Sequence, residues 1–127
     1  MATYKPLHYN SLSPYLIVDN AQELVNQLTD VFNATVLRRY DRPDGSIMHV
    51  ELQLDDSVIM LSNSTAQYPA HKTMLHFYVP DVLATYRRAI NNGCTPISEP
   101  VNQPGDPDTR GSFYDAAGNH WSVSTQQ

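Results

Sequence analysis

The sequence is short of basic residues, cysteine and long apolar runs, and each shortage excludes a class of protein. Its eight lysines and arginines form no cluster and are outnumbered by 13 acidic residues, so we expect no nucleic-acid partner. No apolar stretch approaches the roughly 20 residues that cross a membrane, so we expect no membrane partner. The first residues lack the basic start and apolar run of a secretory signal. The single cysteine, Cys94, cannot form an internal disulfide, which is typical of the reducing cytoplasm.

The rest of the composition is that of an ordinary globular protein. The 127 residues can bury a core without disulfides, and we expect one domain over residues 1–127. The hydrophobic content of 41% and the charged content of 17% are both unexceptional. The net charge of −5 is compatible with a cationic ligand, but solubility alone also accounts for it.

The first half of the chain predicts one helix among four strands. Asp19 or Asn20 can cap the helix, whose apolar residues recur at helical spacing from Ala21 to Phe32. The strands have the alternating or continuous apolar pattern that β-structure favours. The predicted order is strand 13–19, helix 20–32, strand 34–40 and, after a turn at 42–45, strands 46–54 and 57–63.

The second half of the chain repeats this order. Moving the first half along by 61 residues places Val18 on Val79 and the start of one helix on the start of the other. Asp81 is a good N-terminal cap for the second helix, and Gly93 follows its end. The predicted order is strand 74–79, helix 81–93, a strand beginning at 94–98, a proline-rich segment at 99–111, and two strands within 112–125 around a turn at 115–119.

This tandem repeat resembles the vicinal oxygen chelate superfamily, which includes glyoxalase I, bleomycin-resistance proteins, fosfomycin-resistance enzymes and extradiol dioxygenases. The most specific motif is Arg110-Gly111 followed by Asp115 and Gly118-Asn119-His120-Trp121, which is similar to the ending of the PhnB-like branch. The resemblance implies an α+β fold of two tandem βαβββ modules, at about 12–63 and 73–126. Their curved mixed sheets would form an open barrel with the helices outside and a ligand cavity on the concave face. It also makes a homodimer the expected assembly, with a cavity within one chain or between two.

Metal-dependent members of the superfamily hold one divalent cation with two His and two Glu. The resemblance places the corresponding positions at Ser13, Met60, Met74 and Ser122. Hydroxyl and thioether groups are poor ligands for Zn, Ni, Fe or Mn, so we expect no metal at the family site and no cofactor. A relocated site made of His49, Glu51 and His76 stays open as a disfavoured alternative.

Strand alternation then separates two faces of the predicted sheets. The face under the helices is almost purely apolar and includes Met48, Val50, Leu52, Trp121 and Val123. The opposite face mixes polar, aromatic and thioether groups, which suits a cavity for an organic ligand better than a sealed core. Its candidate ligand-binding residues are Tyr15, Gln53, Met60, Met74, Tyr78, His120 and Ser122, and it also includes Ile47, His49, Glu51 and His76.

Glu51 is the leading candidate for chemistry, with His49 or His76 beside it. A poorly solvated Glu51 would have a raised pKa and could act as a general base or hold a cationic group. The alternative is a buried carboxylate that only anchors hydrogen bonds from its neighbours. Arg110 is a further ligand-binding candidate, because segment 99–111 has the length of a lid and Arg110 could meet an anionic group there. Its alternative is a surface pair with Asp108 or Asp115.

Three functions therefore compete. The first is a cytoplasmic small-molecule-binding protein of bleomycin-resistance type that needs no metal. The second is a lyase or isomerase that uses Glu51 with His49 or His76, either metal-free or with a relocated divalent metal. The third is a scaffold whose cavity is filled. We favour the first.

Overall fold

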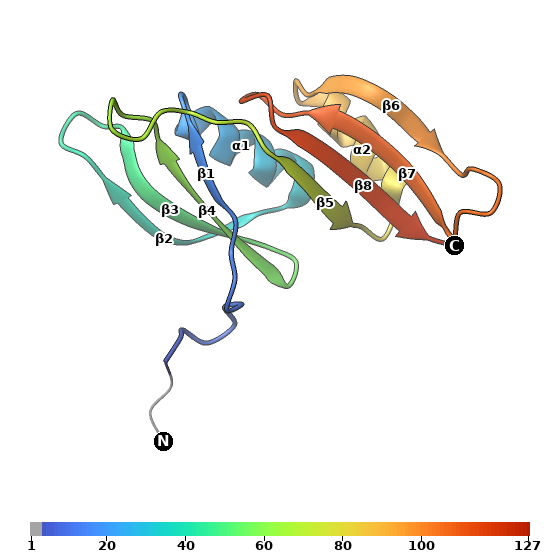
Figure 1. Cartoon of the computed structure of the whole chain (residues 1–127), viewed down its shortest axis with the longest axis horizontal. Coiled ribbons are helices and arrows are strands. Elements are labelled where there is room, and N and C mark those ends of the chain that lie inside the picture. The colour runs from blue at the N-terminus through green and yellow to red at the C-terminus, as the bar shows by residue number, and fades with distance from the viewer. Residues whose placement is uncertain (1–3) are drawn as a thin grey trace.

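The computed structural model describes residues 4–127 and shows two four-stranded sheets side by side (Figure 1). One strand, one helix and three further strands follow each other along the chain, and this order occurs twice. It confirms the predicted α+β class of two βαβββ modules. The first module consists of β1 (Tyr15–Val18), α1 (Ala21–Phe32), β2 (Thr35–Asp41), β3 (Ile47–Leu54) and β4 (Ser57–Asn63). The second consists of β5 (Met74–Tyr78), α2 (Val82–Asn91), β6 (Thr95–Val101), β7 (Asp108–Tyr114) and β8 (His120–Gln126).

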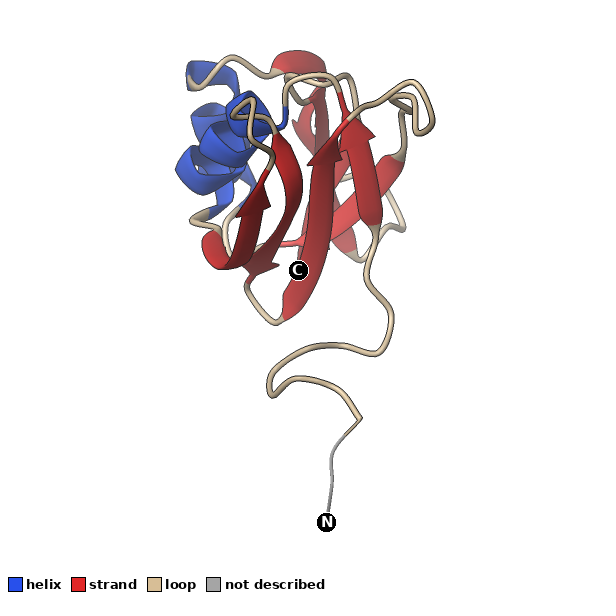
Figure 2. Cartoon of the chain, turned by 90° about the vertical axis from the view of Figure 1, so that its left-hand side faces the viewer, coloured by secondary structure: helices blue, strands red, loops and turns tan. Residues whose placement is uncertain are grey.

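The two sheets have the same topology. Their strand orders are β1-β4-β3-β2 and β5-β8-β7-β6, and the first pair in each, β1 with β4 and β5 with β8, is parallel. The remaining neighbours are antiparallel, so each sheet is mixed and open rather than closed into a barrel. Both helices lie on one side of the strands (Figure 2). We call the side of each sheet that the helices leave uncovered its open face.

Local sequence signals explain where the helices begin and end. The Asn20 side chain accepts a hydrogen bond from the Glu23 backbone N–H at 3.2 Å, and Asp81 accepts one from Ala84 at 3.1 Å. Helix α1 is followed by its C-cap Asn33, which takes the left-handed conformation with φ 57°. Helix α2 is followed by Gly93 at φ 90°, a value that glycine adopts without steric cost.

One buried cluster holds the two modules together. Val50 and Leu52 of the first sheet and Trp121 and Val123 of the second belong to it, as the alternation predicts. Phe32, at the end of α1, packs between the modules, because its ring centroid lies 4.8 Å from that of Trp121.

Strand β3 departs from simple alternation at its start. Tyr40 pairs with His49, but the next residue, Asp41, pairs with Ile47, so Met48 is an extra residue in a β-bulge. The bulge turns Met48 outward, where it is 48% exposed, and leaves Ile47 buried in the core. The predicted placement of Met48 in the core and of Ile47 on the cavity side is therefore wrong.

The proline-rich segment is not a lid. Strand β6 continues to Val101 and β7 already begins at Asp108, so residues 99–111 are mostly paired strand and the connection is short. Gly111 permits this pairing at close range, since a Cβ there would lie 3.0 Å from the Pro100 ring. The predicted long loop is therefore wrong, and Arg110 lies within a strand.

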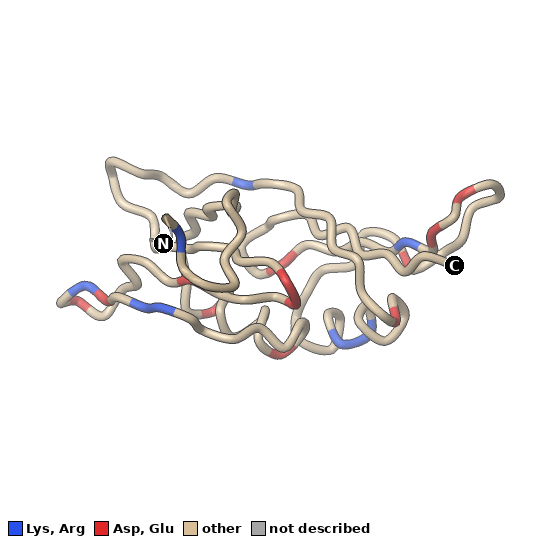
Figure 3. The backbone as a smooth tube through the Cα atoms, turned by 90° about the horizontal axis from the view of Figure 1, so that it is seen from below, with Lys and Arg blue, Asp and Glu red and all other residues tan. Residues whose placement is uncertain are grey.

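Neither helix within residues 4–127 is long and apolar enough to cross a membrane. Lysine and arginine are dispersed along the chain and interspersed with acidic residues (Figure 3). Cys94 is buried, and desolvation raises the pKa of its thiol to about 12, which keeps the thiol protonated and inert.

Candidate functional site

The structure divides the predicted site residues between the open faces of the two sheets. Strand pairing places Tyr15 beside Met60 and Glu51 beside Met60 on the first sheet. On the second sheet, Met74 lies beside His120 and His76 beside Ser122. The first group is Tyr15, His49, Glu51, Gln53 and Met60, and the second is Met74, His76, Tyr78, Arg110, His120 and Ser122.

Glu51 is the centre of a hydrogen-bond network on the first sheet. It is only 6% exposed, and its Oε1 accepts a hydrogen bond from the Tyr9 hydroxyl at 2.5 Å. Its Oε2 lies 2.8 Å from His49 Nε2, and the Arg38 Nε lies 3.8 Å from Oε1. The Tyr15 hydroxyl lies 2.9 Å from His49 Nδ1, so a neutral His49 that donates from Nε2 accepts from Tyr15. The arrangement is a continuous relay from hydroxyl to imidazole to carboxylate.

The network lowers the pKa of Glu51. Burial by itself raises that pKa, but hydrogen bonds from His49 and Tyr9, together with the charge of Arg38, outweigh burial and bring it below its ordinary value. The expected raised pKa of Glu51 is therefore wrong, because its partners compensate for its desolvation. At neutral pH, Glu51 is an anion that accepts hydrogen bonds, and a lowered pKa makes it a weaker general base.

Tyr9 is a site residue that sequence reasoning missed. It lies in residues 4–14, the segment before β1, which we call the N-terminal strap (dark blue in Figure 1). The Arg38 guanidinium lies 5.4 Å from the Tyr9 ring centroid, and burial followed by the bond to Glu51 raises the pKa of Tyr9. The strap has neither helical nor strand periodicity, so nothing local in the sequence indicates that Tyr9 reaches β3.

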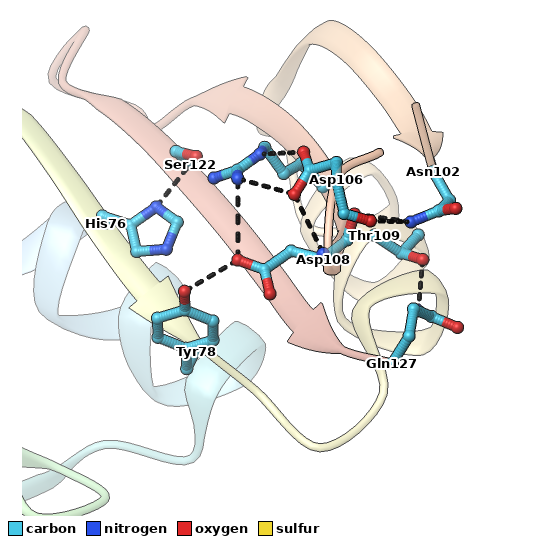
Figure 4. Close-up of polar contacts among 9 residues, drawn as sticks. His76, Tyr78, Asn102, Asp106, Asp108, Thr109, Ser122 and Gln127 are labelled. Carbon is cyan, nitrogen blue, oxygen red and sulfur yellow. Dashed lines mark hydrogen bonds and ion pairs between the residues drawn. The ribbon is translucent and has the colours of Figure 1, made fainter. Parts of the chain in front are cut away.

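The second sheet carries a separate charged cluster (Figure 4). The Tyr78 hydroxyl donates to Asp108 Oδ2 at 2.7 Å, which raises the pKa of Tyr78. Arg110 donates from Nε and Nη2 to Asp106 at 3.0 and 3.1 Å and lies 3.6 Å from Asp108. Of the two interpretations of Arg110, the structure shows the carboxylate-paired one, with Asp106 as its main partner. His76 Nδ1 lies 3.1 Å from the Ser122 hydroxyl.

Three grooves adjoin these residues. The largest, about 700 Å³, lies between the modules and brings Gln53 of the first sheet and Tyr78 of the second into one lining. A second, of about 320 Å³, is lined by Leu12 of the strap, by β4 and by His76. A third, of about 240 Å³, lies on the second sheet, and Arg110, His120 and Ser122 contribute to it. Volumes of this order accommodate small organic molecules.

The residues present do not fit the superfamily's divalent metal. Met60 and Met74 offer only thioethers, and Ser122 offers a hydroxyl that already contacts His76. Within residues 4–127, no three His, Cys, Asp or Glu side chains come together in a way that could hold a metal ion. The relocated set is likewise not assembled within one chain, because His49 and Glu51 lie on the first sheet and His76 on the second.

The fold and the sequence together define the class of protein. Residues 5–123 match the Glyoxalase/Bleomycin resistance protein/Dioxygenase superfamily, and the chain belongs to that superfamily. An uncharacterized protein of Mycobacterium bovis is 32% identical over 124 residues, which cover 89% of this chain and 81% of the relative. An uncharacterized protein of Mycobacterium tuberculosis is also 32% identical, with coverage of 89% and 72%.

Solved structures share the fold at lower identity. TioX from Micromonospora sp. ML1 is 18% identical with a TM-score of 0.79, and the match covers 93% of this chain and 99% of TioX. A PhnB protein from Bacillus cereus, described as a putative 3-demethylubiquinone-9 3-methyltransferase, is 13% identical with a TM-score of 0.73, covering 91% and 99%. TnmS3, an antibiotic binding protein from Streptomyces sp. CB03234, is 16% identical with a TM-score of 0.69, covering 93% and 98%.

Proposed function

We propose that this protein binds a small organic molecule on the open faces of its sheets, without the superfamily's metal. The observation that carries the proposal is the contrast between the two faces of the first sheet. Val50 and Leu52 on one face are fully buried under α1, whereas the other face presents the network of Tyr15, His49 and Glu51. A polar network surrounded by aromatic and thioether groups orients a ligand within apolar walls. The likeness of the fold to an antibiotic binding protein supports the same function.

A thermal-shift screen of small aromatic and hydroxylated compounds tests this function. We expect at least one compound to raise the melting temperature equally with EDTA and with added Zn²⁺ or Mn²⁺. Glu51→Gln should weaken the response, whereas the matched variant Glu99→Gln, on the exposed surface of β6, should not. Stabilisation that depends on metal would contradict the proposal, and silence across the screen would favour a filled scaffold.

The relay on the first sheet favours a second candidate, a metal-free enzyme. His49 bridges the Tyr15 hydroxyl and the Glu51 carboxylate, so the carboxylate stabilises an imidazolium while Tyr15 exchanges a proton with a substrate. In this role Glu51 orients His49 rather than acting as the base. Glu51→Gln should then reduce turnover far more than binding. Equal losses in turnover and binding would remove this candidate.

The assembly we propose is a homodimer. Several large residues on the open faces are between 42% and 65% exposed, which is costly for aromatic and thioether groups in water: Tyr15, Tyr40, Met74, Tyr78 and Tyr114. A second copy related by a two-fold axis would cover both open faces at once and close the cavity between two chains. Sedimentation velocity tests this, because a dimer has twice the 14.3 kDa of one chain. A single species of 14.3 kDa would contradict it.

Two finer assignments are proposals of the same kind. Membership of the PhnB-like branch is supported by the ending from Arg110 to Trp121 and by the fold of the Bacillus cereus protein. A cytoplasmic location is supported by the one cysteine, Cys94, which is buried as a thiol.

A further inference from the structure

The N-terminal strap is attached to the first sheet by few side chains. Tyr4 and Leu12 are 88% and 86% exposed, so the strap buries little apolar surface against β3 and β4. Its side-chain hydrogen bonds with the sheet are the Tyr9 bond to Glu51 and the bond that the Asn10 side-chain oxygen accepts from the Val58 backbone N–H at 3.3 Å. A segment with so few buried contacts opens at low free-energy cost.

Tyr9 contacts the sheet through its hydroxyl and through the face of its ring, two groups that a small aromatic molecule can also offer. Its hydroxyl donates to the Glu51 Oε1 at 2.5 Å, and its ring lies 5.4 Å from the Arg38 guanidinium. The sheet therefore supplies a charged acceptor for one hydroxyl and a cation for one aromatic face. Both groups belong to strands of the sheet, β2 and β3, and not to the strap.

The charges around Glu51 decide which donors fit. The Oε1 that accepts from Tyr9 lies 3.8 Å from Arg38 Nε, so an ammonium group at the Tyr9 position would lie close to the guanidinium and be repelled by it. Glu51 Oε2 already has a hydrogen-bond partner in His49 at 2.8 Å, so a single neutral donor at Oε1 gives both carboxylate oxygens a partner. A neutral aromatic hydroxyl satisfies both conditions, as Tyr9 itself does.

We propose that Glu51 and Arg38 form a binding subsite for a neutral phenol, and that Tyr9 is the resident occupant that a phenolic ligand displaces. The proposal rests on the proposed function and specifies its ligand class. Displacement couples ligand binding to release of the strap, because the hydroxyl of the ligand and that of Tyr9 compete for one carboxylate oxygen. The bound state is then recognisable by a free N-terminal strap.

The test uses p-cresol, the side-chain analogue of tyrosine, titrated into the 127-residue chain and followed by NMR. Tyr9→Ala empties the subsite, and the matched variant Tyr4→Ala removes an exposed tyrosine of the same strap. We expect Tyr9→Ala to bind p-cresol at least about tenfold more tightly than the wild type, because Tyr9 seated in about nine molecules of ten lowers apparent affinity by that factor. Tyr4→Ala should resemble the wild type.

Further measurements keep the test specific to the subsite. The chemical-shift changes that p-cresol causes in Tyr9→Ala should centre on Glu51 and Arg38. Toluene, which lacks the hydroxyl, should bind Tyr9→Ala no more tightly than the wild type, and p-methylbenzylamine should bind Tyr9→Ala more weakly than p-cresol does. Glu51→Gln combined with Tyr9→Ala should lose affinity for p-cresol by several-fold, because a charge-assisted bond becomes a neutral one. Equal affinity of the wild type and Tyr9→Ala, equal binding of toluene, or shifts centred elsewhere would overturn the proposal. If Tyr9→Ala binds p-cresol more tightly but no compound stabilises the wild type in the thermal-shift screen, the subsite is preserved and the proposed function is overturned.

Discussion

Asp115 should be the most sensitive polar position in the second module. Its carboxylate is buried in the turn before β8, where Oδ1 accepts hydrogen bonds from the backbone N–H groups of Ala117 and Asn119, both at 2.9 Å. Its Oδ2 accepts from the Trp121 indole at 2.8 Å and from the Asn119 side chain at 3.1 Å. The turn positions β8, so the open-face residues His120 and Ser122 depend on it.

Asp115→Asn isolates the contribution of the second carboxylate oxygen. The new amide can keep Oδ1 as an acceptor, but its nitrogen then faces two donors, the Trp121 indole and the Asn119 amide. Asn119 cannot turn its amide around freely, since its Oδ1 accepts from the Thr73 backbone N–H at 3.0 Å. A buried donor left without a partner costs about 1–3 kcal/mol, and a lost bond to a charged group about 1.5–3 kcal/mol. These costs overlap, and we expect Asp115→Asn to lower the free energy of unfolding by about 2–4 kcal/mol.

Urea unfolding followed by far-UV circular dichroism measures this loss. The matched background is Trp121→Phe, which keeps an aromatic ring but lacks the indole donor. In that background Asp115→Asn should cost less, by about 1–3 kcal/mol, because the orphaned indole N–H is already absent. A loss below about 0.5 kcal/mol, or an equal loss in both backgrounds, would refute the view that this carboxylate is a hydrogen-bond hub.

Three further predictions concern other buried groups. The fold lowers the pKa of Glu51, so the stabilising contribution of this carboxylate is present above the ordinary carboxyl range and is lost as the pH falls through its folded-state pKa. Urea titrations from about pH 6 to about pH 3 should therefore show that the unfolding free energy depends less steeply on pH in Glu51→Gln than in the wild type, and an equal slope would disprove the pKa shift. The Cys94 thiol, with its pKa of about 12, should resist iodoacetamide until denaturant is added, as mass spectrometry of the labelled protein would show; labelling of the folded protein at the unfolded rate would contradict this. Gln27→Ala should lower the unfolding free energy by about 1–3 kcal/mol in urea, because it leaves the Ala116 N–H and the Asn92 carbonyl without their partner; a neutral effect would mean that water replaces the amide.

Much of the fold follows from sequence because its signals are local and repeated. Caps at Asn20 and Asp81 and the apolar alternation of β3 and β4 each predict an element, and the repeat predicts the order of the whole. The bulge at Met48 was not predictable, because alternation assumes one residue per step and an inserted residue shifts the pattern without changing its composition. The prolines of segment 99–111 predicted a loop, but Pro100 lies in β6, where an edge strand tolerates its missing N–H.

The candidate site was predictable in its residues but not in its energetics. Alternation places His49 and Glu51 side by side, and the structure joins them at 2.8 Å. Burial raises the pKa of Glu51, and His49 lowers it together with Tyr9 and Arg38, which reach Glu51 from a distant part of the chain and from a neighbouring strand. Such contacts leave no periodic trace, so burial alone predicted the opposite shift.

Phe32 belongs to the first repeat by sequence and to the second by contact. Its ring centroid lies 5.0 Å from that of Phe77 and 4.8 Å from that of Trp121, while one buried cluster spans both repeats. A duplicated unit that kept its own interior could accumulate substitutions independently of its twin. Here a change of volume at Phe32 has to be matched by a residue some 45 to 90 positions later, as ordinary core packing requires. Substitutions in the core of one half are therefore constrained by the other half, and the two halves fold together.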